Sequence, residues 1–540
     1  MRILPVSLRV VLVELADLDE TLALFASLEA QPVAAVEEIV PAARTLLVRF
    51  RPGTPPDMAA FTADLRARDI SAKAAASERL VEIPTLYDGE DIDDVARLTG
   101  LTPEAVIARH IASEFTVAFT GFAPGFGYLV GGDPALHVAR RQSPRTRIPA
   151  GTVALAGPFA GVYPQEGPGG WQLIGTTPLK MFDLARDPST LFQPGTRVRF
   201  TRLAERAAFD AIAAREAARA QAVAAPAHRD GTCFLVTAAP MPPLFQDDGR
   251  PGQAAQGVSA SGALDRAALH AANRMVGNEP GEPALEIVGG GFAFTADGAA
   301  VVAITGTDAA LEVRDAAGRR QIAEAYRPVS LEAGDRVTLQ APRRGLRTYL
   351  AVRGGFAVEP VLGSASVDSL ARLGPPAVVV GDRLAVNAQS GRRPVGAPEV
   401  PPKDLPAPGE TVVLDVVMGP RTEWFTQAGI ETLTTQEWTV TPLSNRVGLR
   451  IEGAVPLERR DSTAELPSEG TANGAIQVPH NGQPVLFLAD HPLTGGYPVI
   501  ATLAEYHLDR AGQIPVGARI RFNVIRPFAE IEPERSEGRP

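Results

Sequence analysis

Short apolar runs alternate with helical patterns in the N-terminal segment. Residues 6–13 and 44–50 have the length and apolar composition of strands. Apolar positions at helical spacing follow the potential capping residue Asp17, and residues 57–68 have the pattern of a second helix. Strands and helices that alternate over so short a stretch predict a small α+β domain at residues 1–84.

The next segment passes from helices to short strands. Residues 91–98 and 103–113 have helical spacing, and Thr102 is a suitable N-cap for the second of them. Between residues 115 and 203, short apolar runs are cut by glycine and proline, as expected for a compact β-barrel. We therefore predict a barrel domain at residues 85–203.

Two stretches of unusual composition divide the rest of the chain. Residues 204–230 combine an alanine-rich helix with a linker, whereas residues 390–409 are too rich in Pro and Gly for regular structure. Strand-forming runs dominate the remainder. The pattern predicts a first β domain at residues 231–389, a second β domain at residues 410–530 and a tail at residues 531–540.

One arrangement of glycines occurs twice. In residues 151–171 and again in residues 474–497, a glycine-led strand leads to a Gly-Gly-aromatic turn and a further strand. The repeat hints that two domains share a barrel architecture, although two short matches also arise by coincidence. The predicted fold class is mainly β with α+β, with β-barrel domains preceded by a small α+β domain.

Charge, apolar runs and cysteine content exclude several classes of protein and of site. The net charge of -10 argues against nucleic-acid binding. The sequence has no run of about 18 apolar residues and no N-terminal signal-peptide pattern. The single cysteine, Cys233, excludes an intrachain disulfide and a cysteine-built zinc site. These features predict a soluble, cytoplasmic protein that binds neither nucleic acid nor membrane.

Familiar catalytic signatures are missing. The sequence lacks His-Glu-x-x-His, a Walker A loop and a Gly-x-Ser-x-Gly elbow. Lys180-Met181 lacks the Met-Lys-Met context of a biotin-attachment site. The residues alone therefore predict no biotin attachment and no unaided ATP binding, and none is assigned to a metal.

Three stretches are dense in glycine, proline and aromatic residues. Residues 120–129 and 157–171 could form a pocket rim whose backbone amides meet a carboxylate or amide, or barrel turns with core aromatics. In residues 488–498, Asp490 lies between an apolar strand and a glycine turn, as a site residue or as a turn residue bonded to local amides. Composition leaves these alternatives open.

Other polar candidates are equally ambiguous. His110 lies in the last turn of a predicted helix, where a helix-end cation or a satisfied core residue is the alternative to a catalyst. Asp247 and Asp248 are adjacent carboxylates, which would face opposite ways on a strand and be solvated in a turn. A shared-site perturbation of their pKa values is therefore not expected.

A set of ordered motifs runs through the N-terminal third. They are Gly121-Phe122, Pro124-Gly125-Phe126, Tyr128-Leu129, Ser143-Pro144-Arg145, Ile148-Pro149-Ala150-Gly151, Gly161-Val162-Tyr163-Pro164, Pro168-Gly169-Gly170-Trp171 and Ile174-Gly175-Thr176-Thr177-Pro178. With the helix that ends in His110, this segment resembles allophanate hydrolase subunit 1, which is the kinase-A-inhibitor-like family and includes the B component of 5-oxoprolinase.

A second set of motifs covers the remainder. They include Gln246-Asp247, Gly249-Arg250, Ser261-Gly262-Ala263-Leu264-Asp265, Ala272-Asn273-Arg274, Leu285-Glu286, Leu362-Gly363-Ser364, Asn445-Arg446, Ser468-Glu469-Gly470, Gly474-Ala475-Ile476-Gln477-Val478-Pro479 and Thr494-Gly495-Gly496-Tyr497-Pro498. This part resembles allophanate hydrolase subunit 2, the biotin-dependent carboxyltransferase-like family that includes the C component of 5-oxoprolinase. Asp248, Asn445 and His491 depart from its common pattern, which leaves the substrate open.

The resemblance implies cyclophilin-like barrels in both halves and an ATP-dependent enzyme that opens 5-oxoproline to glutamate. It further implies a separate LamB/YcsF-like protein as the A component, a small-molecule amide substrate, and ATP with Mg held by this chain or by the complex. Dimers or larger homo-oligomers are common among such β-rich fusions. The alternatives are the urea-amidolyase-related carboxyltransferase module of a urea carboxylase, and an inhibitor of a sensor kinase.

The motifs supply the candidate site residues of a cleft between the halves. Acidic residues could hold magnesium or act as bases, and glycine-rich turns could donate amides to a developing oxyanion. The catalytic candidates are Asp247, Asp265, Glu469, Asp490 and His110. The substrate-binding candidates are Gly125, Phe126, Tyr128, Arg145, Tyr163, Trp171, Asn273, Gln477, Thr494, Gly495 and Tyr497.

Overall fold

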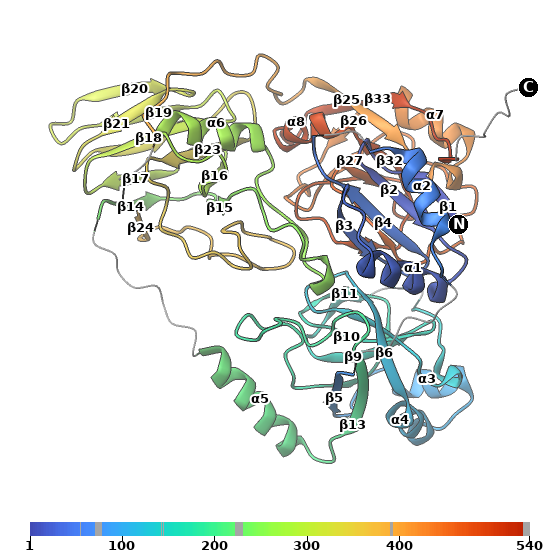
Figure 1. Cartoon of the computed structure of the whole chain (residues 1–540). Helices are drawn as coiled ribbons and strands as arrows, with labels where there is room; N and C mark the ends of the chain where they lie inside the picture. The colour runs from blue at the N-terminus through green and yellow to red at the C-terminus, as the bar shows by residue number, and fades with distance from the viewer. Residues whose placement is uncertain are drawn as a thin grey trace, which may run out of the picture.

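The mainly β architecture expected from the sequence is confirmed (Figure 1). The structure is a computed structural model that describes residues 1–53, 56–70, 78–141, 143, 145–221, 231–388 and 393–532. Among these residues, no helix is both long and apolar enough to cross a membrane.

The N-terminal domain is a four-stranded sheet with two helices. The strand order is β1-β2-β4-β3. The Asp17 carboxylate caps the first helix by accepting a hydrogen bond from the Glu20 amide at 2.9 Å, as its position predicts. The elements are β1 (Arg2–Pro5), β2 (Val10–Glu14), α1 (Leu18–Ala30), β3 (Val36–Pro41), β4 (Thr45–Phe50) and α2 (Met58–Ala67).

The next segment forms a seven-stranded sheet in the order β12-β9-β10-β7-β6-β13-β5, called here the first barrel. A bridge between Leu86 and Thr176 links its two outer strands. Its strands are β5 (Leu80–Thr85), β6 (Glu114–Thr120), β7 (Gly127–Val130), β9 (Thr152–Ala156), β10 (Phe159–Val162), β12 (Gln172–Thr176) and β13 (Arg197–Arg202). It also carries α3 (Ile92–Thr99), α4 (Pro103–Ala112), η1 (Pro134–Leu136) and a ribbon of β8 (Arg145–Ile148) and β11 (Gly167–Gly169).

Helix α5 (Arg206–Gln221) follows and lies apart from the barrel strands (Figure 1). Its position agrees with the helix expected there. The linker expected after it, at residues 222–230, and most of the expected tail, at residues 533–540, lie outside the described residues.

Residues 231–388 form two antiparallel sheets, called here the sheet domain. The first sheet contains β14 (Cys233–Ala238), β17 (Ala293–Ala296), β19 (Ala310–Arg314), β20 (Arg320–Glu324), β22 (Arg336–Leu339) and β24 (Arg383–Ala385). The second contains β15 (Leu244–Gln246), β16 (Ala284–Val288), β18 (Ala300–Thr305), β21 (Pro328–Leu331) and β23 (Arg347–Val352). The domain also contains η2 (Ala254–Gln256) and α6 (Arg266–Val276), whose apolar face packs against β18 and β23.

The last domain is a closed barrel, called here the second barrel. Its strands are β25 (Thr411–Met418), β26 (Trp438–Val440), β27 (Gly448–Glu452), β29 (Ala475–Gln477), β30 (Val485–Phe487), β32 (Val499–Leu503) and β33 (Arg519–Arg526). It also has η3 (Thr422–Trp424), α7 (Gln427–Thr435), η4 (Glu505–His507), α8 (Leu508–Gly512) and a ribbon of β28 (Glu469–Gly470) and β31 (Thr494–Gly495).

The two barrels share one topology. Taken from the first strand, the order is β5-β13-β6-β7-β10-β9-β12 in one and β25-β33-β26-β27-β30-β29-β32 in the other. In both barrels, the strands that come first and last along the chain pair in parallel, β5 with β13 and β25 with β33. Each barrel also carries an additional two-stranded ribbon. The repeated glycine pattern seen in the sequence falls on the equivalent strands β9 to β12 and β29 to β32.

The N-terminal sheet packs on the second barrel, far from it in sequence (Figure 1). The Ala43 amide donates to the Ser468 carbonyl at 3.1 Å, and the Ile531 amide donates to the Ile3 carbonyl at 2.8 Å. Apolar side chains from both domains share one buried cluster, including Leu47 and Leu493. The first and last parts of the chain therefore form one packed unit.

Candidate functional site

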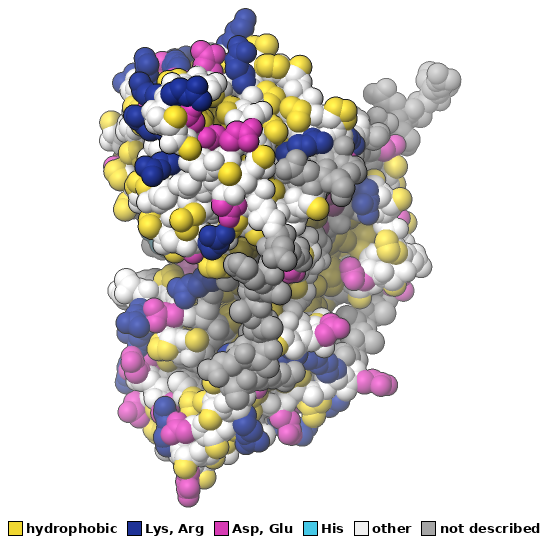
Figure 2. Space-filling view, turned by 90° about the vertical axis from the view of Figure 1, so that its left-hand side faces the viewer, with side chains coloured by type: hydrophobic (Ala, Val, Ile, Leu, Met, Phe, Trp, Pro, Cys, Tyr) yellow, Lys and Arg dark blue, Asp and Glu magenta, His cyan; other side chains and the backbone are white. Residues whose placement is uncertain are grey.

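The first barrel and the sheet domain meet at one junction. The Thr120 hydroxyl donates to the Ala254 carbonyl at 3.0 Å, the Gly125 amide donates to the Gln256 carbonyl at 2.9 Å, and Gln165 donates to the Leu370 carbonyl at 3.1 Å. Seen from the side of β20 and α5, Figure 2 shows a waist between the upper lobe, which is the sheet domain, and the lower lobe of α5 and the first barrel. Glycine-rich loops from both halves line this junction.

Backbone strain is concentrated in the same loops. Among the described residues, five non-glycine residues have φ in the left-handed region, and four of them lie in loops of this junction: Phe122 (63°), Ser261 (54°), Leu362 (52°) and Arg372 (55°). Such conformations cost about 1–3 kcal/mol each and cluster at functional sites. Their concentration marks the junction as the candidate site.

Asp247 organises one of these loops. Its carboxylate accepts hydrogen bonds from the Ser364 and Ser366 hydroxyls, both at 2.5 Å, and from the amides of Ala365 and Gly249 at 2.7 and 2.8 Å. Four donors occupy both oxygens, so the carboxylate holds the loop at residues 364–366 in place. Asp247 follows β15 outside the strand, but the expectation of a solvated carboxylate is wrong for it: Asp247 is buried, because these four donors replace its hydration, whereas Asp248 is exposed.

Asp490 is buried where the sheet domain meets the second barrel. It accepts hydrogen bonds from the Ser261 hydroxyl at 2.6 Å and from the Ser369 hydroxyl at 2.7 Å, and it pairs with Arg446 at 3.0 Å. Burial alone would raise the pKa of Asp490, but the Arg446 guanidinium outweighs it and holds that pKa below its usual value. Asp490 is an ionised group that ties loop residues of the sheet domain to the barrel.

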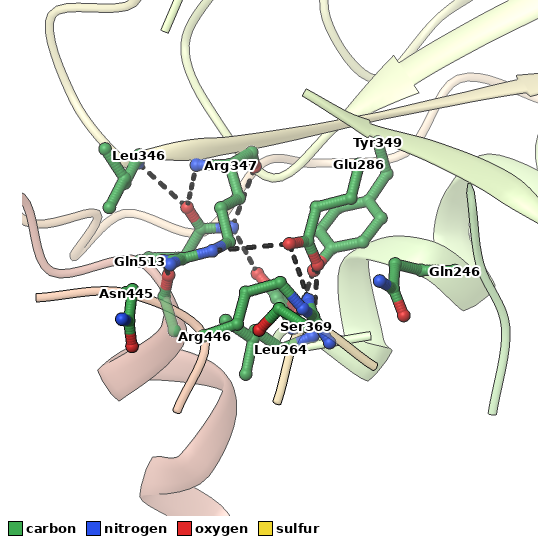
Figure 3. Close-up of polar contacts among 12 residues, drawn as sticks. Gln246, Leu264, Glu286, Leu346, Arg347, Tyr349, Ser369, Asn445, Arg446 and Gln513 are labelled. Atoms are coloured by element: carbon green, nitrogen blue, oxygen red, sulfur yellow. Dashed lines mark hydrogen bonds and ion pairs between the residues drawn. The ribbon is translucent and has the colours of Figure 1, made fainter. Parts of the chain in front are cut away.

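Arg446 extends this contact into a buried polar network (Figure 3). Its guanidinium also donates to Glu286 at 2.6 Å, and Glu286 accepts a hydrogen bond from the Tyr349 hydroxyl at 2.7 Å. Arg347 lies 3.4 Å from the same carboxylate. Burial would raise the pKa of Glu286, and the Arg446 and Arg347 guanidinium groups together lower it. The network joins the sheet domain to the second barrel.

Asp265 lies at the edge of this network. It caps α6 by accepting from the Ala268 amide at 2.8 Å, and its other oxygen accepts from the Gln513 side chain at 2.7 Å. Gln513 also accepts from the Leu346 and Arg347 amides, which fixes its orientation (Figure 3). Burial, with Asp509 adding to it, raises the pKa of Asp265 to about 7.

Glu469 lies on the β28–β31 ribbon, away from that network. Arg421 donates to it at 2.9 Å through Nε and to Glu14 of the N-terminal domain at 2.8 Å. Burial raises the pKa of Glu469 despite the Arg421 contact. These side chains line a cavity of about 170 Å³ between the N-terminal domain and the second barrel.

His110 lies apart from the junction, in the core of the first barrel. Its ring packs 4.4 Å from Phe200 and 5.2 Å from Phe115, centroid to centroid, and Nδ1 lies 2.8 Å from the Tyr87 hydroxyl. Complete burial lowers the pKa of His110 to about 3. This neutral ring corresponds to the core-histidine alternative left open by the sequence.

Most of the predicted aromatic wall is buried. Phe126, Tyr128, Tyr163 and Trp171 are between 1% and 6% exposed and share one apolar cluster that also receives Leu18 and Leu22 of α1. This arrangement corresponds to the core-aromatic alternative. Gly125 sits among them with φ of 78°, where its amide joins the two halves.

The other binding candidates divide between the domains. Arg145 pairs with Asp91 at 2.7 Å, and Asn273 donates to the Glu282 carbonyl at 2.7 Å from within α6. Gln477 donates to the Tyr497 carbonyl at 3.2 Å. Thr494 is buried, whereas its ribbon neighbour Gly495 and Tyr497 are half-buried. Gly125 lies at the junction and Asp247 anchors a loop of the sheet domain, whereas Asp490 lies between the sheet domain and the second barrel. Arg145, Asn273 and His110 lie elsewhere.

The carboxylates do not fit a magnesium site. The oxygens of Asp247 and Asp490 are occupied by hydroxyl, amide or guanidinium donors, and Glu469 is bonded to Arg421. Within the described ranges, no group of three His, Cys, Asp or Glu side chains is arranged to hold a metal ion.

Sequence analysis did not assign Arg446, Glu286 or Arg421 to the site. Glu286 is the one charged residue in the buried strand Ala284–Val288, an unusual placement that signals a buried partner. Arg421 offers no comparable local signal, because both of its principal partners are more than forty positions away along the chain.

Gly121 is a point of close approach between the two barrels. A Cβ on Gly121 would lie 2.3 Å from the Thr494 hydroxyl oxygen. Gly121→Ala is therefore expected to lower the free energy of unfolding by about 1–3 kcal/mol through overpacking, measured by chemical denaturation. Adding Thr494→Ala should restore part of that loss, since the Thr494 hydroxyl has no hydrogen-bond partner among the described residues. A double variant that is no more stable than Gly121→Ala alone would show that the two residues are not in contact.

Two protein-family models match the chain. The model described as carboxyltransferase domain, subdomain C and D, matches residues 1–192. The model described as carboxyltransferase domain, subdomain A and B, matches residues 256–524. The unmatched residues between them, 193–255, include β13 of the first barrel, α5, and β14 and β15 of the sheet domain.

Named relatives match each half. The C component of 5-oxoprolinase of Escherichia coli (strain K12) is 37% identical over 280 residues, which cover 51% of this chain and 86% of that protein. The B component of 5-oxoprolinase of Bacillus subtilis (strain 168) is 44% identical over 144 residues, covering 26% of this chain and 60% of that protein. Urea amidolyase of Lachancea kluyveri is 30% identical over 294 residues, or 51% of this chain and 16% of that protein.

A solved structure has the same overall organisation. The crystal structure of TTHA0988 superposes with a TM-score of 0.79 at 31% sequence identity, covering 95% of this chain and 100% of that chain. The arrangement of domains is thus shared along nearly the whole chain.

Proposed function

The chain belongs to the carboxyltransferase-domain family and joins a half like the B component of 5-oxoprolinase to a half like the C component, and from this premise we propose that it is the fused B and C component of a 5-oxoprolinase. A separate A component completes the enzyme, which opens 5-oxoproline to glutamate at the expense of ATP. The single observation that carries the proposal is the junction, where loops from both halves interlock.

The junction offers groups suited to a small anionic amide. Opening an amide requires donors for the carbonyl oxygen as it becomes anionic, and glycine-rich loops can supply backbone amides. Arg372 is exposed there, and among the described residues it has no ion-pair partner. Its guanidinium can therefore bind the substrate carboxylate. ATP and Mg are assigned to the complex, with the A component as their holder, in a cytoplasmic setting that suits the single thiol of Cys233.

Reconstitution tests the proposal. Mixing the chain with the A-component homologue of the same genome, ATP, magnesium and 5-oxoproline should release glutamate only when both proteins are present. Arg372→Ala should lower kcat/KM by about tenfold or more. Arg343→Ala, at an exposed arginine of the sheet domain between β22 and β23, is the matched control. Both proteins folded but no glutamate would refute the proposal.

The relation to urea amidolyase supports a second candidate, a carboxyltransferase module. That function predicts no glutamate release but transfer of a carboxyl group from carboxybiotin on a separate carrier to urea. Labelled bicarbonate, a biotin carboxylase and its carrier would reveal it in the same preparation.

Homo-oligomerisation remains a prediction, which light scattering of the purified chain tests.

A further inference from the structure

The cavity beside Glu469 has no role in the proposed reaction. It lies between the N-terminal sheet and the second barrel, with a volume of about 170 Å³. Its lining combines the apolar surfaces of Trp424, Leu466 and Pro467 with charged side chains from both domains. Water occupies about 30 Å³ per molecule, so the cavity has room for several waters or one small ligand.

Two of the three arginines in the lining are engaged. Arg2 pairs with Glu14 and with Glu423, both at 2.7 Å. Arg421 pairs with Glu14 at 2.8 Å and with Glu469. The three carboxylates of the lining are therefore paired with these two guanidinium groups, each of which bridges more than one of them.

Arg44 is the third arginine of the lining. It lies in the turn between β3 and β4, is exposed, and donates one bond, to the Leu15 carbonyl at 3.3 Å. Within the described part of the chain it has no carboxylate partner, so the cavity faces a guanidinium with unused donors. Exposed arginines are usually solvated, but this one borders a cavity with an apolar wall.

Glu469 adds a second polar group. It is buried, with its pKa raised chiefly by that burial and further by Glu14 and Glu423, although Arg421 opposes the shift. Both of its oxygens already accept hydrogen bonds from Arg421. Arg44 is therefore the lining residue whose donors can bind the anionic group of a ligand.

We propose that this cavity binds a small monocarboxylate, with Arg44 holding the carboxylate and the apolar wall of Trp424 and Leu466 covering the remainder. Pockets for larger ligands occupy about 300 Å³ or more, which excludes a nucleotide here. Glu469 belongs to the ribbon that also carries Thr494, which touches Gly121 at the junction. A ligand in the cavity would therefore stabilise the β28–β31 ribbon, which contacts the first barrel through Thr494.

Binding of acetate and of its neutral isostere acetamide to the intact chain tests the proposal. Saturation-transfer NMR should detect acetate and not acetamide, because the carboxylate is the group that Arg44 holds. Arg44→Met should weaken acetate binding by about tenfold or more. The measurement uses neither the A component nor ATP, so its outcome is independent of the proposed reaction.

Arg51→Met is the matched control. Arg51 is also exposed at the same sheet and donates one bond to a backbone carbonyl, that of Ala34 at 3.1 Å, but it does not line the cavity. Unchanged acetate binding in Arg51→Met with a loss in Arg44→Met would support the site. Equal binding of acetate and acetamide, no acetate binding, or equal losses in both variants would overturn it.

Discussion

Replacing Arg446 with methionine is expected to lower the free energy of unfolding by about 3–5 kcal/mol. The change removes the guanidinium that pairs with Glu286 at 2.6 Å (Figure 3). The same guanidinium pairs with Asp490 at 3.0 Å. Both carboxylates are buried and lie within the protein, so neither can recover its lost hydration. Equilibrium denaturation in urea measures the loss.

Arg450→Met provides the matched control. Arg450 lies four positions later, on β27, and its side chain is exposed. The same substitution there should change the free energy of unfolding by less than about 0.5 kcal/mol. Equal effects at the two positions would show that the buried network does not contribute as described. Replacing Glu286 and Asp490 by neutral isosteres in the Arg446→Met background should recover part of the stability, because the unpaired charges are then absent.

Local patterns in the sequence located many elements. The helix start at Thr102 is confirmed, since its hydroxyl accepts a hydrogen bond from the Ala105 amide at 3.2 Å. The repeated glycine pattern correctly indicated related barrels, because glycine-led strands and Gly-Gly turns are local features. The packing of the N-terminal sheet on the second barrel was not predictable. It depends on contacts such as that of Ala43 with Ser468, which leave no periodic trace in either segment.

The site was harder to predict than the fold, because residue type does not reveal burial. Asp490 was identified as a polar residue beside a glycine turn, but its ionised state depends on Arg446, more than forty positions earlier. His110 has the same residue type as a catalytic base, yet Phe115 and Phe200 enclose it. The aromatic residues near Gly125 were predicted as a possible pocket wall, but they form a buried cluster against which Leu18 and Leu22 of α1 pack.

The stability contributed by Asp265 is expected to decline as the pH rises from about 4 to about 7. Burial raises the pKa of Asp265 to about 7 in the folded protein, against about 4 in an unfolded chain. Between these values the folded protein holds a proton that the unfolded chain has released. Raising the pH therefore favours unfolding, and the stabilisation that is complete below about pH 4 is lost above about pH 7. The full change is of the order of 4 kcal/mol.

Asp265→Asn isolates this contribution. The variant retains an oxygen that can accept from the Ala268 amide but carries no titrating proton. The free energy of unfolding of the wild type minus that of the variant, measured by denaturation from pH 4 to 8, should fall as the pH rises. Asp57→Asn is the control, because Asp57 caps α2 in the same way at an exposed position. A wild-type-minus-Asp265→Asn difference that stays flat, or that rises with pH, would show that Asp265 is ionised throughout and that its bonds to Ala268 and Gln513 outweigh its burial.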